Sequence, residues 1–230
     1  MFKDRSEAGK KLAGVLSRWS FAKGIVMAIP RGGVVVGAEV ANTLDIDLDL
    51  IIPRKIGAPH NPEVAVGAVT QDGTAIFDDV LLARLGLERK DLAETVACEI
   101  KEIKRRMKAY RKSADFPDLG GKPVIVVDDG VATGCTMLAA LRSVRKYNPL
   151  AVTLAVPVAP RETLTVLRRE ADRTVCLHSP EVFYAVGQFY ADFEQTGDEE
   201  VVRLLKKAGQ KRDKPPGREH LNAAYENTGV

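Results

Sequence analysis

Short apolar runs recur along the chain and predict buried parallel strands. Five runs rich in valine, isoleucine and leucine share this character, at residues 25–29, 48–52, 124–127, 151–156 and 174–177. Because each run is continuously apolar, we expect both faces of each strand to be covered. Helical spacing of apolar positions lies between and around these runs, at residues 6–19, 34–44, 136–147 and 161–171. This alternation predicts an α/β fold built on a doubly wound, mostly parallel sheet.

Two neighbouring segments depart from this alternation. Residues 64–77 place Asp72-Gly73 between two β-prone runs, which is a strong signal for a β-hairpin. Over residues 79–112, apolar side chains recur at helical spacing while lysine and arginine crowd the other positions. We therefore expect a hairpin followed by a helical insertion.

Length and composition favour one domain. A chain of 230 residues can bury about 70% of the surface that it exposes when unfolded, so one core is sufficient. We expect this domain to span residues 1–208, with residues 178–208 forming a C-terminal hood and helix. Residues 209–230 are polar and contain Pro215-Pro216, which predicts a flexible tail.

Charge and cysteine usage narrow the class of protein. The 34 basic and 31 acidic residues leave a net charge of +3, so we expect no nucleic-acid partner. Cys98, Cys135 and Cys176 stand at no metal-ligand spacing, which is typical of free thiols in a reducing compartment. The sequence also lacks the pattern of a signal peptide or a membrane span. We therefore expect a cytoplasmic protein without a membrane partner.

The candidate chemistry lies in residues 124–136, VIVVDDGVATGCT. A buried strand runs into a loop of small residues and then into a helix, so backbone N–H groups and the positive end of the helix dipole converge there. Glycine and alanine allow close approach of the backbone to an anion, and threonine hydroxyls add donors. The predicted phosphate-binding loop comprises Gly130, Val131, Ala132, Thr133, Gly134, Cys135 and Thr136.

Two adjacent carboxylates, Asp128 and Asp129, stand between the strand and this loop. A carboxylate beside a phosphate would repel it, so the acid pair is expected to bind another group of the same ligand. Two carboxylates can accept hydrogen bonds from the vicinal hydroxyls of a ribose 5′-phosphate, and their charge favours a developing cation at C1′. We predict Asp128 and Asp129 as the catalytic pair.

The stretch from Val124 to Thr136 resembles the signature of the type I phosphoribosyltransferases: four hydrophobic residues, two acidic residues and a small-residue loop that ends in Thr-Gly-x-Thr. Two further stretches, IPRGG at 29–33 and IPRKIG at 52–57, follow strands in the order in which this family places its diphosphate-binding segments. The resemblance covers roughly residues 20–180. Within the family, the pattern of this chain is similar to that of bacterial members of undefined substrate. It implies the type I phosphoribosyltransferase fold.

The resemblance implies that the donor is phosphoribosyl pyrophosphate. Arg31, Gly32 and Gly33 would bind its diphosphate, partly through backbone amides in an unusual peptide conformation. Arg54 and Lys55, at the end of the next strand and before a mobile loop, would contact the same group, since guanidinium and ammonium suit a diphosphate. Mg²⁺ would be carried by the donor, so no protein metal ligand is expected.

The acceptor is expected beneath the hood. Phe183 and Tyr184, within the aromatic cluster of residues 179–193, present ring faces that can stack a base, although packing of the hood explains them equally well. Residues 155–160, AVPVAP, lack the lysine that 6-oxopurine members of the family carry there, which argues against hypoxanthine or guanine. The identity of the nitrogen acceptor and the presence of a homodimer are left open.

The sequence thus predicts an enzyme that transfers a 5-phosphoribosyl group to a nitrogen nucleophile, such as a nucleobase, and releases pyrophosphate. One alternative is a non-catalytic regulator that senses phosphoribosyl pyrophosphate and binds RNA through the basic residues 101–112. A solvated helix face also explains that cluster, because Glu102 stands one helical turn before Arg106. A hydrolase of nucleoside monophosphates is a third hypothesis.

Overall fold

A parallel sheet forms the centre of the fold. The computed structural model describes residues 1–59, 61–111 and 116–212. Within them, the central sheet has the strand order β2-β1-β6-β7-β8, and all neighbouring strands are parallel. Its strands are β1 (Ile25–Ala28), β2 (Asp47–Leu50), β6 (Pro123–Val127), β7 (Ala151–Val158) and β8 (Arg173–His178). The predicted doubly wound α/β fold and its strands are confirmed.

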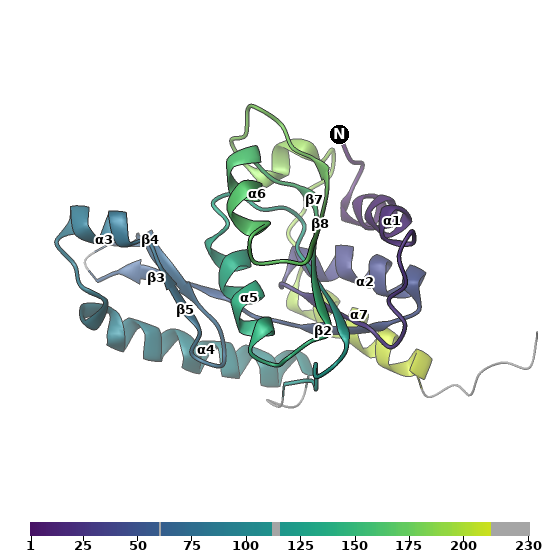
Figure 1. Cartoon of the computed structure of the whole chain (residues 1–230), viewed down its shortest axis with the longest axis horizontal. Helices are drawn as coiled ribbons and strands as arrows, with labels where there is room; N and C mark the ends of the chain where they lie inside the picture. Colours follow the sequence, from purple (N-terminus) through teal and green to yellow (C-terminus); the bar gives the residue numbers. More distant parts are fainter. Residues whose placement is uncertain (60, 112–115, 213–230) are drawn as a thin grey trace, which may run out of the picture.

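Helices cover both faces of this sheet (Figure 1). On one face lie α1 (Arg5–Leu16) and α2 (Gly32–Leu44). On the other lie α5 (Cys135–Arg145) and α6 (Arg161–Leu167). This arrangement explains why the strand sequences show no alternation, since neither face of the sheet meets water.

Strand β6 shows this double burial residue by residue. Val124 and Val126 belong to the core beneath α5 and α6. Ile125 and Val127 belong to the core beneath α1 and α2. All four side chains are fully buried, so the strand that carries the acid pair has little freedom to move.

A second, antiparallel sheet projects from the centre of the molecule. It consists of β3 (Arg54–Ala58), β4 (Asn61–Val69) and β5 (Ala75–Phe77), in that order. The β4–β5 hairpin confirms the prediction for residues 64–77. From the sequence, residues 54–57 were expected to end the preceding strand and to lead into a loop. This prediction is wrong, because these residues form part of a new strand, β3. Pro53 has no N–H to continue the hydrogen bonds of the parallel sheet, so the preceding strand stops before it.

Helices complete this projection, and we call residues 54–111 the arm. The predicted helical insertion is divided into α3 (Asp79–Leu85), the 3₁₀ helix η1 (Arg89–Leu92) and α4 (Ala93–Arg111). Gly86, with φ 65°, ends α3. Figure 1 shows α4 running from the arm back beneath the central sheet, where buried apolar residues of α4 share one core with the C-terminal helix.

Two boundaries near the chain ends differ from the sequence expectation. Helix α1 ends at Leu16, so Trp19 lies outside it and is 37% exposed. After β8 the hood contains the 3₁₀ helix η2 (Val186–Phe189), and the C-terminal helix α7 (Asp198–Arg212) extends beyond residue 208. The rest of the predicted tail, residues 213–230, lies outside the described residues.

In the described part of the chain, no helix combines the length and apolar character needed to cross a membrane.

Candidate functional site

The acid pair stands at the carboxyl end of β6, where the strand leaves the sheet. The backbone N–H of Asp129 donates a 2.8 Å hydrogen bond to Oδ1 of Asp128. Burial and the neighbouring Asp129 carboxylate raise the pKa of Asp128 well above its usual value. Burial also raises the pKa of Asp129, although an arginine partner opposes this effect. Such a pair is costly by itself and is favoured by a ligand that supplies hydroxyl donors or positive charge.

The predicted phosphate-binding loop joins β6 to α5. Gly134 takes the left-handed conformation, with φ 85°, and serves as the N-cap of α5. Ala132 and Thr133 are exposed, while Cys135 and Thr136 begin the helix and are half-buried. Within the described residues no side chain caps this helix, so its first N–H groups are free to bind an anion.

Helix α6 supports the phosphate-binding loop from one side. The Thr163 hydroxyl donates a 2.7 Å hydrogen bond to the carbonyl oxygen of Ala132. A Cβ atom at Gly134 would lie 2.7 Å from the Thr163 methyl group, so a larger residue would push the loop away from α6. Thr163 was not identified from the sequence, because it lies on another helix outside the motif.

Replacing Thr163 with valine should weaken binding of the expected donor, phosphoribosyl pyrophosphate, about two- to tenfold, because the loop loses the hydrogen bond that fixes Ala132. Calorimetric titration measures the change. Thr165→Val is the matched control: its hydroxyl bonds to Arg161 within the same helix, at 3.0 Å, and does not touch the loop. Equal affinities of the two variants would contradict the supporting role of Thr163.

The predicted diphosphate-binding segment lies beside the acid pair, at the end of β1. The peptide bond between Pro30 and Arg31 is cis, and α2 begins at Gly32. A Cβ atom at Gly32 would overlap the Asp129 carboxylate, and one at Gly33 would lie 2.8 Å from the Cα of Asp128. The segment and the acid pair are therefore in direct contact.

Helix α2, like α5, begins without a capping side chain among the described residues, and its first turn contains no acidic residue. Arg31 stands at this end and forms a 3.5 Å ion pair with Asp198 of α7. Strands β1 and β6 are neighbours, so two uncapped helix N-termini flank one acid pair at the same edge of the sheet. Such an edge is where open α/β sheets bind their ligands.

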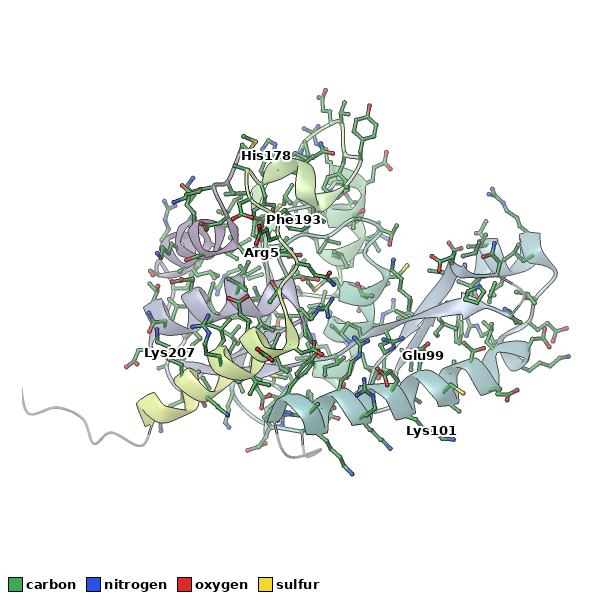
Figure 2. All side chains as sticks on the ribbon, turned by 180° about the vertical axis from the view of Figure 1, so that it is seen from behind. Arg5, Glu99, Lys101, His178, Phe193 and Lys207 are labelled. Atoms are coloured by element: carbon green, nitrogen blue, oxygen red, sulfur yellow. The ribbon has the colours of Figure 1, made fainter. Side chains whose placement is uncertain are left out.

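Arg54 and Lys55 occupy a cleft between the arm and the start of α5. The cleft has a volume of about 490 Å³, and Thr136 of the phosphate-binding loop also lines it. Arg54 forms an ion pair with Glu99 of α4, whereas Lys55 is exposed. Figure 2 shows Glu99 at the root of the arm. The structure thus brings this pair close to the predicted phosphate-binding loop, and Glu99 is a further residue that the sequence did not reveal.

The hood reaches the acid pair through other residues than those predicted. The Tyr190 hydroxyl donates a 2.6 Å hydrogen bond to the carbonyl oxygen of Asp129, and a Cβ at Gly130 would overlap Val186. Phe183 packs against another hood ring, that of Phe189, 5.3 Å away. Tyr184, the other predicted acceptor residue, is 87% exposed. The acceptor role of Phe183 and Tyr184 stays a prediction.

The N-terminal residues complete the hood. The N–H of Phe2 donates to the carbonyl of Phe189, at 2.7 Å, and its own carbonyl accepts a 2.8 Å bond from the N–H of Ala191. The rings of Phe2 and Tyr190 are 5.4 Å apart. The N-terminal residues and the hood therefore cover the acid pair together.

Comparison with known proteins identifies the family of the chain. Residues 5–194 match the sequence profile described as "Phosphoribosyl transferase domain". The chain belongs to the phosphoribosyl transferase family. The crystal structure of TT1426 from Thermus thermophilus is 39% identical and has a TM-score of 0.76, and the match covers 90% of this chain and 98% of that one. The family and fold expected from the sequence are therefore confirmed.

Two curated relatives are also similar to this phosphoribosyl transferase chain. They are the Mycobacterium tuberculosis proteins named "Putative phosphoribosyl transferase MT0597" and "Putative phosphoribosyl transferase Rv0571c", each 38% identical over 208 residues. The match covers 90% of this chain but 47% of each relative. The chain thus spans about half the length of the curated relatives it matches.

The cation that contacts the acid pair is Arg5, which the sequence did not identify. Its Nε donates a 2.6 Å hydrogen bond to Oδ2 of Asp129, 124 positions along the chain. Two of the predicted cations of this phosphoribosyl transferase have other partners: Arg31 pairs with Asp198, and Arg54 pairs with Glu99. The sequence gives only indirect evidence of such a residue: a buried pair of acids favours a positively charged partner, but the sequence does not indicate which residue this is.

Proposed function

We propose that this phosphoribosyl transferase moves a 5-phosphoribosyl group from phosphoribosyl pyrophosphate to a nitrogen nucleophile, with a nucleobase as the acceptor. The observation that supports the proposal best is the acid pair between two uncapped helix N-termini, those of α2 and α5. Each helix end suits a phosphate group, and the carboxylates suit the ribose hydroxyls between them. A donor with two phosphate-bearing ends and a sugar centre has this layout.

In the proposed reaction Asp128 and Asp129 accept hydrogen bonds from the ribose hydroxyls, and Ala132 to Thr136 bind the 5′-phosphate. The bond between C1′ and the diphosphate oxygen breaks, a bond between C1′ and the acceptor nitrogen forms, and that nitrogen releases its proton to water. As diphosphate departure leads attack, the charged carboxylates stabilise positive charge at C1′.

The leaving diphosphate would bind at the N-terminus of α2, beside Arg31, Gly32 and Gly33. Arg54 and Lys55 would approach it from the arm. Within the described residues, no cluster of three His, Cys, Asp or Glu side chains is arranged around a metal site, and Mg²⁺ commonly binds through substrate phosphates. The positive end of α2 fits a diphosphate that carries Mg²⁺. When bound, Mg²⁺ would neutralise the leaving group.

Calorimetric titration of phosphoribosyl pyrophosphate with Mg²⁺ into the purified chain tests the donor site. We expect saturable binding that weakens when Mg²⁺ is chelated. Nucleobases added to the complex should then release pyrophosphate in proportion to the base supplied. A folded protein that does not bind the donor would overturn the proposal.

Donor binding without turnover with any base would favour the regulator hypothesis instead. The structure keeps that hypothesis testable, because Lys101, Lys104 and Lys108 of α4 are exposed. An RNA-binding regulator should lose RNA affinity steeply as salt increases. Figure 2 shows Lys101 pointing away from the body of the molecule.

A further inference from the structure

Arg5 is built into the donor site more deeply than an ordinary surface arginine. Its side chain is 12% exposed and that of its partner Asp129 is 15% exposed. The guanidinium lies 3.8 Å from the centre of the Phe193 ring, and Nη1 donates a 2.7 Å hydrogen bond to the carbonyl of Glu194. Figure 2 shows Arg5 and Phe193 next to each other beneath the hood. These contacts fix the position of the guanidinium on three sides.

The ion pair also lies against the diphosphate-binding segment. A Cβ atom built on Gly32 would overlap Oδ2 of Asp129 and would stand 2.6 Å from Nε of Arg5. Arg5 therefore meets the acid pair and the backbone that is proposed to bind the diphosphate. A displaced guanidinium would leave the Asp129 side chain free to turn within this junction.

The groups that face Asp129 come from three parts of the chain. Asp128 precedes it and adds a second negative charge, and the Tyr190 phenol of the hood bonds to its backbone carbonyl. Arg5 comes from α1 and bonds to the carboxylate itself. The nearby Arg31 is directed toward Asp198. Among the described residues, Arg5 is thus the cation that directly compensates the acid pair.

We propose that Arg5 is a positioning residue of the donor site, which holds Asp129 charged and oriented toward the ribose; this inference rests on the proposed function. Donor binding requires the carboxylate to accept hydrogen bonds, so a protonated Asp129 binds poorly. Burial raises the pKa of Asp129, and the Arg5 guanidinium lowers it again. Loss of the guanidinium therefore raises the pKa, and binding should fail at a higher pH than in the wild type.

The test compares donor affinity, in the presence of Mg²⁺, between pH 5.5 and pH 9 for the wild type, Arg5→Gln and Arg5→Lys. At the acidic end of this range, Arg5→Gln should bind about tenfold more weakly than the wild type and should recover as the pH rises, so its midpoint should lie above that of the wild type. Arg5→Lys keeps the charge, so its midpoint should stay near that of the wild type. Titration of the donor's own phosphates affects all variants equally.

Lys11→Gln is the matched control, because it removes a cation from the same helix, one that pairs with Glu7 at 3.0 Å. Its pH midpoint should equal that of the wild type. A uniform loss of affinity in Arg5→Gln, with an unchanged midpoint, would assign Arg5 a purely structural role and overturn the inference. Failure of the wild type to bind the donor would instead overturn the proposed function.

A second measurement separates these ideas if Arg5→Gln does not fold. The same substitution in an Asp128→Asn background, which we expect to be more stable, allows the Asp129 carboxyl to be followed by ¹³C NMR without any ligand. Its titration midpoint should be higher with Gln than with Arg at position 5. Equal midpoints would overturn the inference whatever the donor binding shows.

Discussion

Replacing Gly32 with alanine should abolish donor binding, with a loss of at least about 100-fold in affinity. The added Cβ would overlap the Asp129 carboxylate and stand 2.6 Å from Nε of Arg5. One of these groups, or the start of α2, must then move, and each of them is part of the proposed donor site. Because the site depends on a direct contact between backbone and carboxylate, a single methyl group is sufficient to disrupt it.

Gly14→Ala is the control for this substitution. Gly14 lies inside α1, and a Cβ there meets nothing within 4 Å. This variant should be more stable than the wild type by about 1 kcal/mol, since alanine is the better helix former, and should bind the donor normally. Calorimetry gives the affinities and circular dichroism the melting temperatures. Wild-type donor affinity in a folded Gly32→Ala protein would refute the predicted contact.

Asp128→Asn should raise stability while it removes donor binding. The wild-type carboxylate is buried and lies beside a second negative charge, both of which raise its pKa. The amide avoids this charge, and its oxygen can still accept the hydrogen bond from the Asp129 N–H. We expect a gain of about 1 kcal/mol and a melting temperature about 2–4 °C higher at neutral pH. Affinity should fall at least about 100-fold, and Asp128→Asn, Asp129→Asn should bind no donor.

The stability difference between Asp128→Asn and the wild type should depend on pH. A raised pKa means that the folded state binds the proton more tightly than the unfolded state, so wild-type stability falls as the pH rises through the range between the two pKa values. The advantage of Asp128→Asn should therefore be largest above that range and vanish in acid.

Asp172→Asn is the opposite control. Hydrogen bonding to Arg145 lowers the pKa of Asp172, so the folded state favours its charged form. Its substitution should reduce stability at neutral pH. Thermal unfolding at several pH values tests both variants. A destabilised Asp128→Asn protein would show that the Asp128 carboxylate does not destabilise the folded protein.

The central sheet and the acid pair were predictable because their signals are local. Strand β6, the acid pair and the phosphate-binding loop are continuous in sequence, and each has a distinct composition. A strand buried on both faces needs apolar residues at every position, which is what residues 124–127 show. Strand β3 was missed for a local reason too: its register shifts between Ile56 and Gly57 and again between Gly57 and Ala58, so no regular alternation is present.

The partners of the acid pair were not predictable, because they depend on contacts between distant segments. Arg5 lies 124 positions before Asp129 in the sequence, and Tyr190 lies 61 positions after it. Glu99 reaches Arg54 only because α4 folds back along the arm. Neither residue type nor spacing marks such residues in a sequence, since any exposed arginine, tyrosine or glutamate looks the same until the topology is known.

The shared cover of the acid pair has a consequence for the order of biosynthesis. Arg5 is synthesised before the two aspartates, and Val186 and Tyr190 are synthesised after them. A nascent chain that ends between these points contains the acid pair and its Arg5 partner without the hood residues that contact them. Competence to bind the donor is therefore expected to follow the synthesis of Tyr190, after the first strands of the sheet have paired.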